Sequence, residues 1–152
     1  MFPLYTVANK MAENLSAFLK QNAIAAENEK YVVSKRFVDK GEPVEWEICV
    51  INAVEDEELR KSYTKRIQVN GKRNLYRSEL DANAYLAGLA VKCTVYPNLH
   101  DSALQDSYGV KGAEKLLKAM LEPGEYYDYI TKVQELNGFD VSMEEKVEEA
   151  KN

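Results

Sequence analysis

Histidine and cysteine are scarce in this chain, which has one His and two Cys among its 152 residues. His100 follows a turn and has no Cys or carboxylate at metal-ligand spacing, which favours a surface or capping role over that of a ligand or general base. Cys49 and Cys93 are far apart, sit in apolar settings and form no CxxC motif. We interpret them as reduced core thiols rather than as a disulfide or a nucleophile, and we expect no catalytic residue, metal or cofactor.

Motifs of common enzymes are also missing. Gly71-Lys72 lacks the upstream glycine of a phosphate loop, and GVKG at 109–112 is too short for a dinucleotide fingerprint. The carboxylates occur as solvated runs at 55–58 and 144–149, rather than as isolated pairs in apolar surroundings. The sequence therefore predicts a protein that is not an enzyme.

No apolar run approaches the roughly 18 residues that a membrane-spanning helix needs, and no basic-then-apolar segment opens the chain. We therefore expect no contact with a membrane, and a protein that stays in the cytoplasm of the cell that makes it. With 45% hydrophobic and 30% charged residues, the composition is typical of a globular protein. At this length we expect a single domain over residues 1–152.

The net charge of −5 conceals an uneven distribution. Residues 60–77 contain seven basic side chains and no acid, whereas residues 122–152 contain nine acids and three bases. Opposite charge in two parts of one chain favours head-to-tail self-association or a charged partner. The basic segment could also bind phosphates, with Tyr63 and Tyr76 stacking on bases, but the acidic net charge makes nucleic acid the weaker interpretation.

The most apolar stretch, residues 82–100, carries a single formal charge. Its large side chains recur on one side of a helical wheel, and its small residues gather on the opposite side. A helix that is apolar on both sides is usually buried. We predict a central helix at about 79–96, capped by Ser78 or Asp81 and stopped by Pro97.

Two segments before this helix are typical of β-hairpins. The first covers residues 31–51 and turns at DKGE, and placing Val38 opposite Pro43 sets its register. That register predicts further pairs: Tyr31 with Val50, Arg36 with Glu45, and Lys35 over the Trp46 ring. The second is a basic β-tongue at about 64–77, with Asn70-Gly71 as a two-residue turn.

Apolar periodicity predicts several more helices. The predicted helices are one at about 7–22 with Thr6 as its cap, Glu55–Ser62, a short one capped by Asp101 and stopped by Gly109, one from Ala113 to Leu121, Glu125–Asn137 with Phe139 folding back after Gly138, and a last acidic one with a Ser142–Glu145 capping box.

Together these elements predict an α+β fold that is mainly helical. It has an N-terminal amphipathic helix, a β-hairpin, the basic β-tongue, and a C-terminal helical bundle around the central buried helix. By region we expect a helix and linker at 1–30, the hairpins at 31–77, the helical core at 78–139 and an acidic helix that frays at 140–152.

Four blocks of the sequence are distinctive: KYVVSKRFVDKGEPVEWEI, ELRKSYTKRI, VYPNLHDSALQDSYGVKGAEKLLKAMLEPGEY and KVQELNGF. In the same order and with similar spacing, they resemble the XkdN-like tail assembly chaperones of phages and defective prophages. The resemblance covers nearly the whole chain from about residue 15.

This resemblance implies a role without enzymatic chemistry. Such chaperones associate with the tape measure protein that sets tail length, while the tail tube polymerises around it in the cytoplasm of the bacterial host. They are absent from the mature virion. In many long-tailed phages a programmed frameshift adds a domain that contacts the tail tube protein, so a longer form of this chain and that protein are further expected partners.

Two surfaces are candidates for these interactions. We expect the client to contact residues of the C-terminal helices, namely Leu117, Met120, Tyr126, Tyr127 and Tyr129, of which Tyr127 should point outward. We expect homo-oligomers to form through the basic segment, using Lys65, Arg66, Lys72 and Arg73. The alternatives are a nucleic-acid-binding phage protein that uses residues 60–77, and a structural component of the tail.

Overall fold

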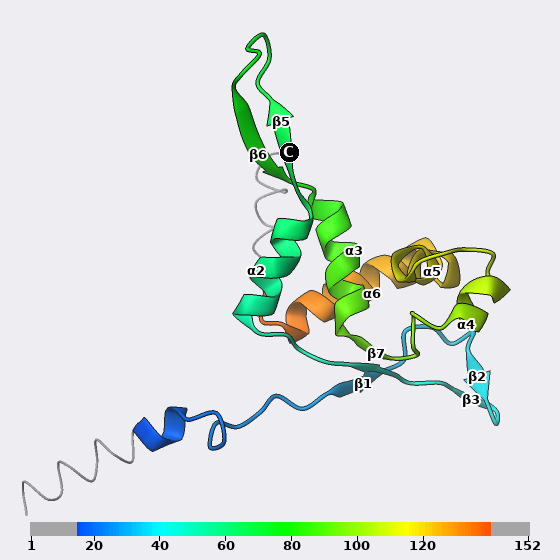
Figure 1. The fold of residues 1–152 in the computed structure, drawn as a ribbon. Helices are drawn as coiled ribbons and strands as arrows, with labels where there is room; N and C mark the ends of the chain where they lie inside the picture. The colour runs from blue at the N-terminus through cyan, green and yellow to red at the C-terminus, as the bar shows by residue number, and fades with distance from the viewer. Residues whose placement is uncertain (1–14, 141–152) are drawn as a thin grey trace, which may run out of the picture.

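The computed structural model describes residues 15–140 and gives an α+β fold, as predicted (Figure 1). The elements are, in chain order, β1 (Glu29–Tyr31), β2 (Val38–Asp39), β3 (Glu42–Pro43), β4 (Trp46–Ile48), α2 (Ala53–Ser62), β5 (Thr64–Gln68), β6 (Tyr76–Leu80), α3 (Ala82–Cys93), β7 (Thr94–Tyr96), α4 (Ser102–Ser107), α5 (Ala113–Met120) and α6 (Pro123–Leu136). The Thr6 cap and the Ser142–Glu145 capping box lie outside the described residues. Of the predicted N-terminal helix, residues 15–18 are helical and residues 19–22 form a turn, so the helix ends earlier than predicted.

Helix α3 is the buried centre of the fold, and α2, α5 and α6 all contact it (Figure 1). Asp81 caps its first turn by accepting a hydrogen bond from the Ala84 N–H at 3.2 Å. Large residues such as Leu89 and small ones such as Ala87 are both buried, which confirms a helix covered on two sides.

The central helix stops at Cys93, so the predicted end at residue 96 is wrong. Residues 94–96 instead form β7, which pairs antiparallel with β4. Thr94, Val95 and Tyr96 have β-branched or aromatic side chains that favour a strand, and Tyr96 precedes a proline, which disfavours helical backbone. The free edge of β4 provides the partner that helical periodicity could not reveal.

A three-stranded sheet in the order β1-β4-β7 lies beside the helices. Trp46 and Ile48 of the middle strand are almost fully buried. The Trp46 ring meets the Tyr129 ring of α6 edge to face, with centroids 5.2 Å apart. This contact joins the sheet to the helices and excludes the predicted stacking of Lys35 on Trp46.

The first hairpin has two registers. At its tip Val38 faces Pro43, as predicted, but at its base Tyr31 faces Trp46 rather than Val50. The two sides of the hairpin therefore differ by four residues between these pairs, and the excess lies in residues 32–37. Of these, residues 32–36 leave the ladder, whereas the Phe37 carbonyl still accepts a hydrogen bond from the Val44 N–H at 2.8 Å. Val33 in this segment is buried in the core. Burial of that side chain and the contacts of Arg36 compensate for the lost strand pairing.

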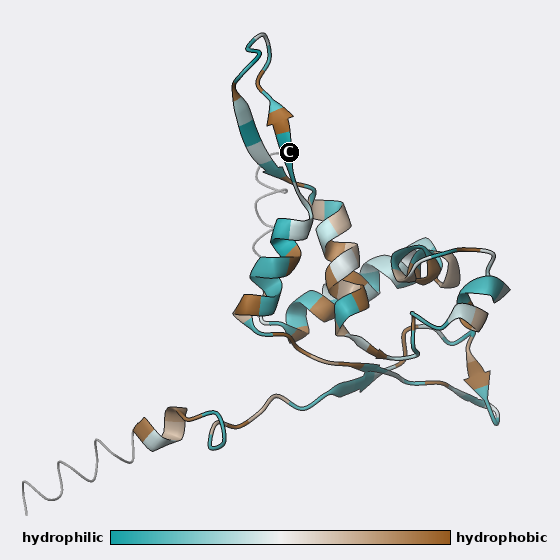
Figure 2. Cartoon of the chain, viewed as in Figure 1, coloured by the Kyte–Doolittle hydropathy of each residue, from teal (hydrophilic) through white to brown (hydrophobic). Residues whose placement is uncertain are grey.

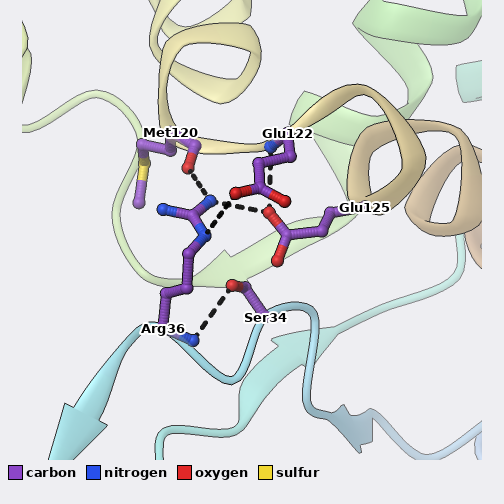
Figure 3. A network of polar contacts seen from close by, with 5 residues as sticks. All are labelled: Ser34, Arg36, Met120, Glu122 and Glu125. Atoms are coloured by element: carbon purple, nitrogen blue, oxygen red, sulfur yellow. Dashed lines mark hydrogen bonds and ion pairs between the residues drawn. The ribbon is translucent and has the colours of Figure 1, made fainter.

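Arg36 holds the 32–37 segment against the junction of α5 and α6, so its predicted pairing with Glu45 is wrong. Its Nη2 donates to the Met120 carbonyl at 2.8 Å and to Glu125 Oε1 at 2.6 Å (Figure 3). The same Glu125 oxygen accepts from the Glu122 backbone N–H at 2.9 Å. Hydrogen bonds from Arg36, Ser34 and the Glu122 backbone lower the pKa of Glu125 from 4.5 to about 2.

The C-terminal helices follow the predicted pattern. Asp101 caps α4 by accepting from the Leu104 N–H at 2.8 Å. Helix α6 begins at Pro123, two residues before the predicted start, because proline fits the first turn of a helix. It ends in the predicted Schellman arrangement, in which the Phe139 N–H donates to the Gln134 carbonyl at 3.0 Å.

Candidate interaction surfaces

Within residues 15–140 the structure brings together no three His, Cys, Asp or Glu side chains that could hold a metal ion. His100 is exposed, and its backbone N–H donates to Asn98 Oδ1 at 3.1 Å. Burial raises the pKa of Cys93 to about 11 and also raises the pKa of Cys49. Both thiols therefore stay protonated at neutral pH, which suits packing better than nucleophilic chemistry.

The tongue consists of β5, β6 and the loop between them (residues 64–80). It stands away from the helices (Figure 1). Its ladder runs from Thr64 opposite Leu80 to Gln68 opposite Tyr76. This hairpin confirms the basic β-tongue predicted at about 64–77. Its loop is longer than the predicted two residues, because the ladder register places Val69 opposite Leu75 and the chain turns twice between them. Gly71, with a φ of 77°, occupies the first of these turns.

The four predicted self-association residues all lie on the tongue, but their surroundings differ. Lys65 pairs with Asp81 at 3.6 Å, within the same chain. The Arg66 guanidinium lies 4.6 Å from the centre of the Tyr76 ring. Lys72 and Arg73 are exposed in the loop, and no carboxylate of residues 15–140 pairs with them. Within residues 15–140, the tongue cations without a carboxylate partner are therefore Arg66 in the ladder and Lys72 and Arg73 in the loop.

The foot of the tongue is fixed to the body through Tyr63. Its carbonyl accepts a hydrogen bond from the Asp81 N–H at 2.9 Å, which joins the two ends of the hairpin. Its hydroxyl donates to the Glu114 carboxylate of α5. Burial, together with that carboxylate, raises the pKa of Tyr63 to about 12. The ring lies directly over Gly88 of α3, where a Cβ atom would lie 2.5 Å from the Tyr63 hydroxyl oxygen and 2.6 Å from the ring carbon Cε2.

A neighbouring polar cluster holds α2 against α3. Tyr85 donates to Asp56, and the same carboxylate pairs with Arg60 at 2.9 Å. The Arg60 guanidinium lies 4.4 Å from the centre of the Tyr85 ring and 5.9 Å from that of Phe139. A cavity of about 210 Å³ lies beside this cluster, between α2, α3 and the end of α6. The polar groups of Tyr85, Asp56 and Arg60 bond to one another, which indicates a structural cluster rather than a reactive one.

Residues 15–28 form an N-terminal arm, which leads away from the body of sheet and helices (Figure 1). Four large apolar side chains are exposed on it: Leu15, Phe18, Leu19 and Ile24. Phe18 is 82% exposed and Ile24 is 101% exposed. The hydrogen bonds that residues 16–23 form with other described residues are all local. Figure 2 shows the hydrophobic colour at the outer end of the arm, far from the apolar core.

The predicted client-binding residues are placed very differently from one another. Leu117 and Tyr129 are fully buried and Met120 is nearly so, which makes these three core residues in this fold. The Tyr129 hydroxyl shares a 2.6 Å hydrogen bond with Thr94 Oγ1. Tyr126 is half-buried, whereas Tyr127 is 67% exposed and points outward as predicted. The apolar stripe indicated burial correctly, and only Tyr127 offers a fully accessible side chain.

Sequence reasoning did not identify the arm or the β2–β3 hairpin as surfaces. The periodicity predicts an amphipathic helix and linker for the arm, and the isolated Ile24 after the polar turn is the signal for an exposed apolar segment. At the hairpin, Asp39, Glu42 and Glu45 are exposed. The sequence DKGEPVE contains three acids within seven residues, and this is the signal from which an acidic surface could have been predicted.

The chain is similar in sequence to known proteins. The model of the family described as phage XkdN-like tail assembly chaperone protein matches residues 15–151. Protein YqbN of Bacillus subtilis strain 168 is 36% identical over 95% of this chain and 97% of its own length. The phage-like element PBSX protein XkdN of the same strain is 33% identical with the same coverage.

The fold is also similar to a solved structure. The crystal structure of YqbN superimposes with a TM-score of 0.70 at 33% identity, and the match covers 82% of this chain and 96% of that one. No helix within residues 15–140 has the length and apolar character needed to cross a membrane. The family match begins at residue 15 and so includes the arm. This chain therefore belongs to the phage XkdN-like tail assembly chaperone family.

Proposed function

We propose that this protein binds the tape measure protein of a phage tail, keeps it soluble while the tail tube assembles, and catalyses no reaction. Membership of the chaperone family supports the class of function. The observation that carries the proposal is the arm, whose exposed apolar side chains have no cover within the described chain. Exposed apolar groups that project together from a folded body are typical of a binding surface.

The size of the arm suits reversible binding. Burying a side chain such as Phe18 or Ile24 is worth about 1.5–3 kcal/mol, so four of them give a modest gain before the cost of ordering the arm is subtracted. A long apolar client bound by many copies would be held by the sum of such contacts. Each copy could still leave when the tube replaces it, as a chaperone absent from the mature virion requires.

Co-expression with the tape measure protein tests this function. The wild-type chain should raise the soluble fraction of the client, and Phe18→Ser with Ile24→Ser on the arm should abolish most of that gain. Val54→Ser on α2 is the matched control, because Val54 is an apolar side chain 63% exposed on the body. A client that stays insoluble with the wild type, or equally soluble with the arm variant, would contradict the proposal.

Nucleic-acid binding is a second candidate because Lys72 and Arg73 pair with no carboxylate of residues 15–140 and lie in the loop next to the exposed Tyr76. It predicts retention of DNA or RNA that weakens steeply as salt is added. A role as a structural tail component predicts instead that mass spectrometry finds this chain in purified particles. The same preparations would reveal a longer frameshifted form or a tail tube protein bound to it.

A further inference from the structure

The three-stranded sheet has an inner face toward the helices and an outer face away from them (Figure 1). Trp46 and Ile48 of β4 are buried on the inner face. Because side chains alternate along a strand, Glu47 between them points to the outer face. Its cross-strand partners there are Lys30 of β1 and Tyr96 of β7. Tyr96 is 54% exposed, so the outer face presents an accessible aromatic ring.

The outer face is apolar at both edges, and its two charges are opposite. Val95, the extra residue at the bulge in β7, and Val32, directly after β1, are both exposed. Lys30 and Glu47 lie opposite each other on neighbouring strands. Such a surface attracts neither a polyanion nor a polycation, and it gains from burial against apolar groups. It therefore suits a partner segment that is apolar and carries few charges.

The arm continues directly from this sheet. Its strand β1 is fixed to the body, because Glu29 pairs with Lys132 of α6 at 3.2 Å. Residues 25–28 connect this fixed strand to the exposed Ile24. Extended, they span about 13 Å, and strands about 4.8 Å apart place Tyr96 about 10 Å from β1. A bend in residues 25–28 is therefore enough to bring Ile24 over the Tyr96 ring.

Neither surface is sufficient by itself. The outer face offers Val32, Val95 and Tyr96, which fall well short of the roughly 1,000 Å² that a specific protein–protein interface buries. The arm exposes more apolar area, but its hydrogen bonds to described residues are local, so it must be ordered when it binds. Together they enclose a bound segment from two sides, and the sheet supplies the part that is already fixed.

We infer, on the basis of the proposed function, that the outer face of the sheet is the floor of the client site and that the arm closes over it. The arm carries Lys20 and Glu27 as its charged residues, so it is balanced in charge like the outer face. The segment of the tape measure protein held between them is therefore apolar and weakly charged.

Site-specific photo-crosslinking of the full chain, co-expressed with the tape measure protein, tests this arrangement. The crosslinker p-benzoylphenylalanine replaces Tyr96, Phe18 or Tyr127, one position at a time. Tyr127 is the matched control, because this exposed tyrosine precedes the buried Tyr129 by two residues and so lies on the side of α6 away from the sheet. Tyr96 and Phe18 should both crosslink to the client, within one apolar and weakly charged segment identified by mass spectrometry. Tyr127 should give little or no crosslink.

Substitution measures how much the outer face contributes. Tyr96→Ser with Val95→Ser should weaken binding of the tape measure protein about tenfold in pull-down at several chaperone concentrations. Tyr127→Ser should bind like the wild type, and circular dichroism checks that each variant is folded. If the serine variant unfolds, the crosslink from position 96 decides the question. Unchanged binding by a folded Tyr96 variant would overturn the inference.

The crosslinks also separate this inference from the proposed function. If Phe18 crosslinks to the client and Tyr96 does not, the function stands and the inference is overturned. The inference is equally overturned if the two positions reach separate client segments, if their shared segment is rich in charge, if Tyr96 crosslinks only to another copy of this chain, or if Tyr127 crosslinks as strongly as Tyr96. If no position reaches the client and the client stays insoluble, the proposed function fails and the inference with it.

Discussion

At the scale of single residues, one missing side chain determines how the tongue is attached. Gly88 lies in the middle of α3, where glycine costs about 0.5–1 kcal/mol relative to alanine. The Tyr63 ring occupies the space that a Cβ would need, and its hydroxyl is held by Glu114. The ring therefore cannot move aside without losing that hydrogen bond. Close packing here outweighs the intrinsic preference of a helix for alanine.

We expect Gly88→Ala to lower the free energy of unfolding by about 1–3 kcal/mol, because overpacking exceeds the gain in helix propensity. Urea unfolding followed by circular dichroism measures this difference. Gly124→Ala is the control, since Gly124 is also helical but a Cβ there meets nothing within 4 Å. The control should be neutral or slightly stabilising. Equal stability of the Gly88 variant and the wild type would show that the Tyr63 ring is free to shift.

At the scale of elements, the irregular 32–37 segment is held to the helices by charge rather than by strand pairing. The Arg36–Glu125 pair, at 2.6 Å, joins it to the start of α6. The pKa of Glu125 is lowered to about 2, so the ionised form is favoured by folding. The stability from this pair is therefore fully present above the ordinary pKa of 4.5 and is lost as the pH falls from there toward 2.

Glu125→Gln should therefore lower stability at neutral pH and flatten its decline in acid. Thermal unfolding measured from pH 7 down to the acid limit of solubility would show the wild type and the variant converging as Glu125 becomes protonated. Glu135→Gln on the same helix is the control, since Glu135 is exposed and has no ion pair among the described residues. Parallel curves for wild type and the Glu125 variant would mean that Arg36 contributes nothing through this carboxylate.

The predictable elements are those whose causes are local. Asp101 before α4, Gly138 after α6 and the apolar stripe of α5 each act within one or two turns, and the structure confirms all three. The base of the first hairpin and the end of α3 were predicted wrongly because distant groups decide them. The register at Tyr31 depends on burying Val33, and residues 94–96 become a strand because β4 has an edge to offer.

The candidate surfaces could be predicted only in part for the same reason, because distant groups decide which side chains stay accessible. The apolar spacing of Leu117, Met120 and Tyr129 indicates one covered face, but it cannot say whether this protein or a client covers it. In the structure this face is covered by the core of the protein itself. The basic character of the tongue was readable from composition, yet which cations remain unpaired depends on Asp81 and Tyr76, which only the folded ladder places near Lys65 and Arg66.

At the scale of the whole molecule, the two proposed contacts differ in their physical origin. The arm offers apolar side chains to a client, whereas the tongue, the predicted self-association surface, offers positive charge to another copy. Salt separates these contributions, because the screening length falls from about 10 Å at about 0.1 M salt to about 3 Å at about 1 M. Apolar burial is not weakened by this change.

We therefore expect a salt titration of the client complex to remove contacts between copies before contacts with the client. As NaCl rises from about 0.1 M to about 1 M, the mass of the free chaperone assembly should fall toward that of one chain, while the client stays soluble with copies bound. Sedimentation velocity of the free protein, and pelleting of the complex at each salt concentration, measure the two effects side by side. If the client precipitates at the salt concentration where the free assembly dissociates, solubility depends on the assembled state and the arm alone is insufficient. If neither changes, the association between copies is not electrostatic, and the basic tongue is not the self-association surface.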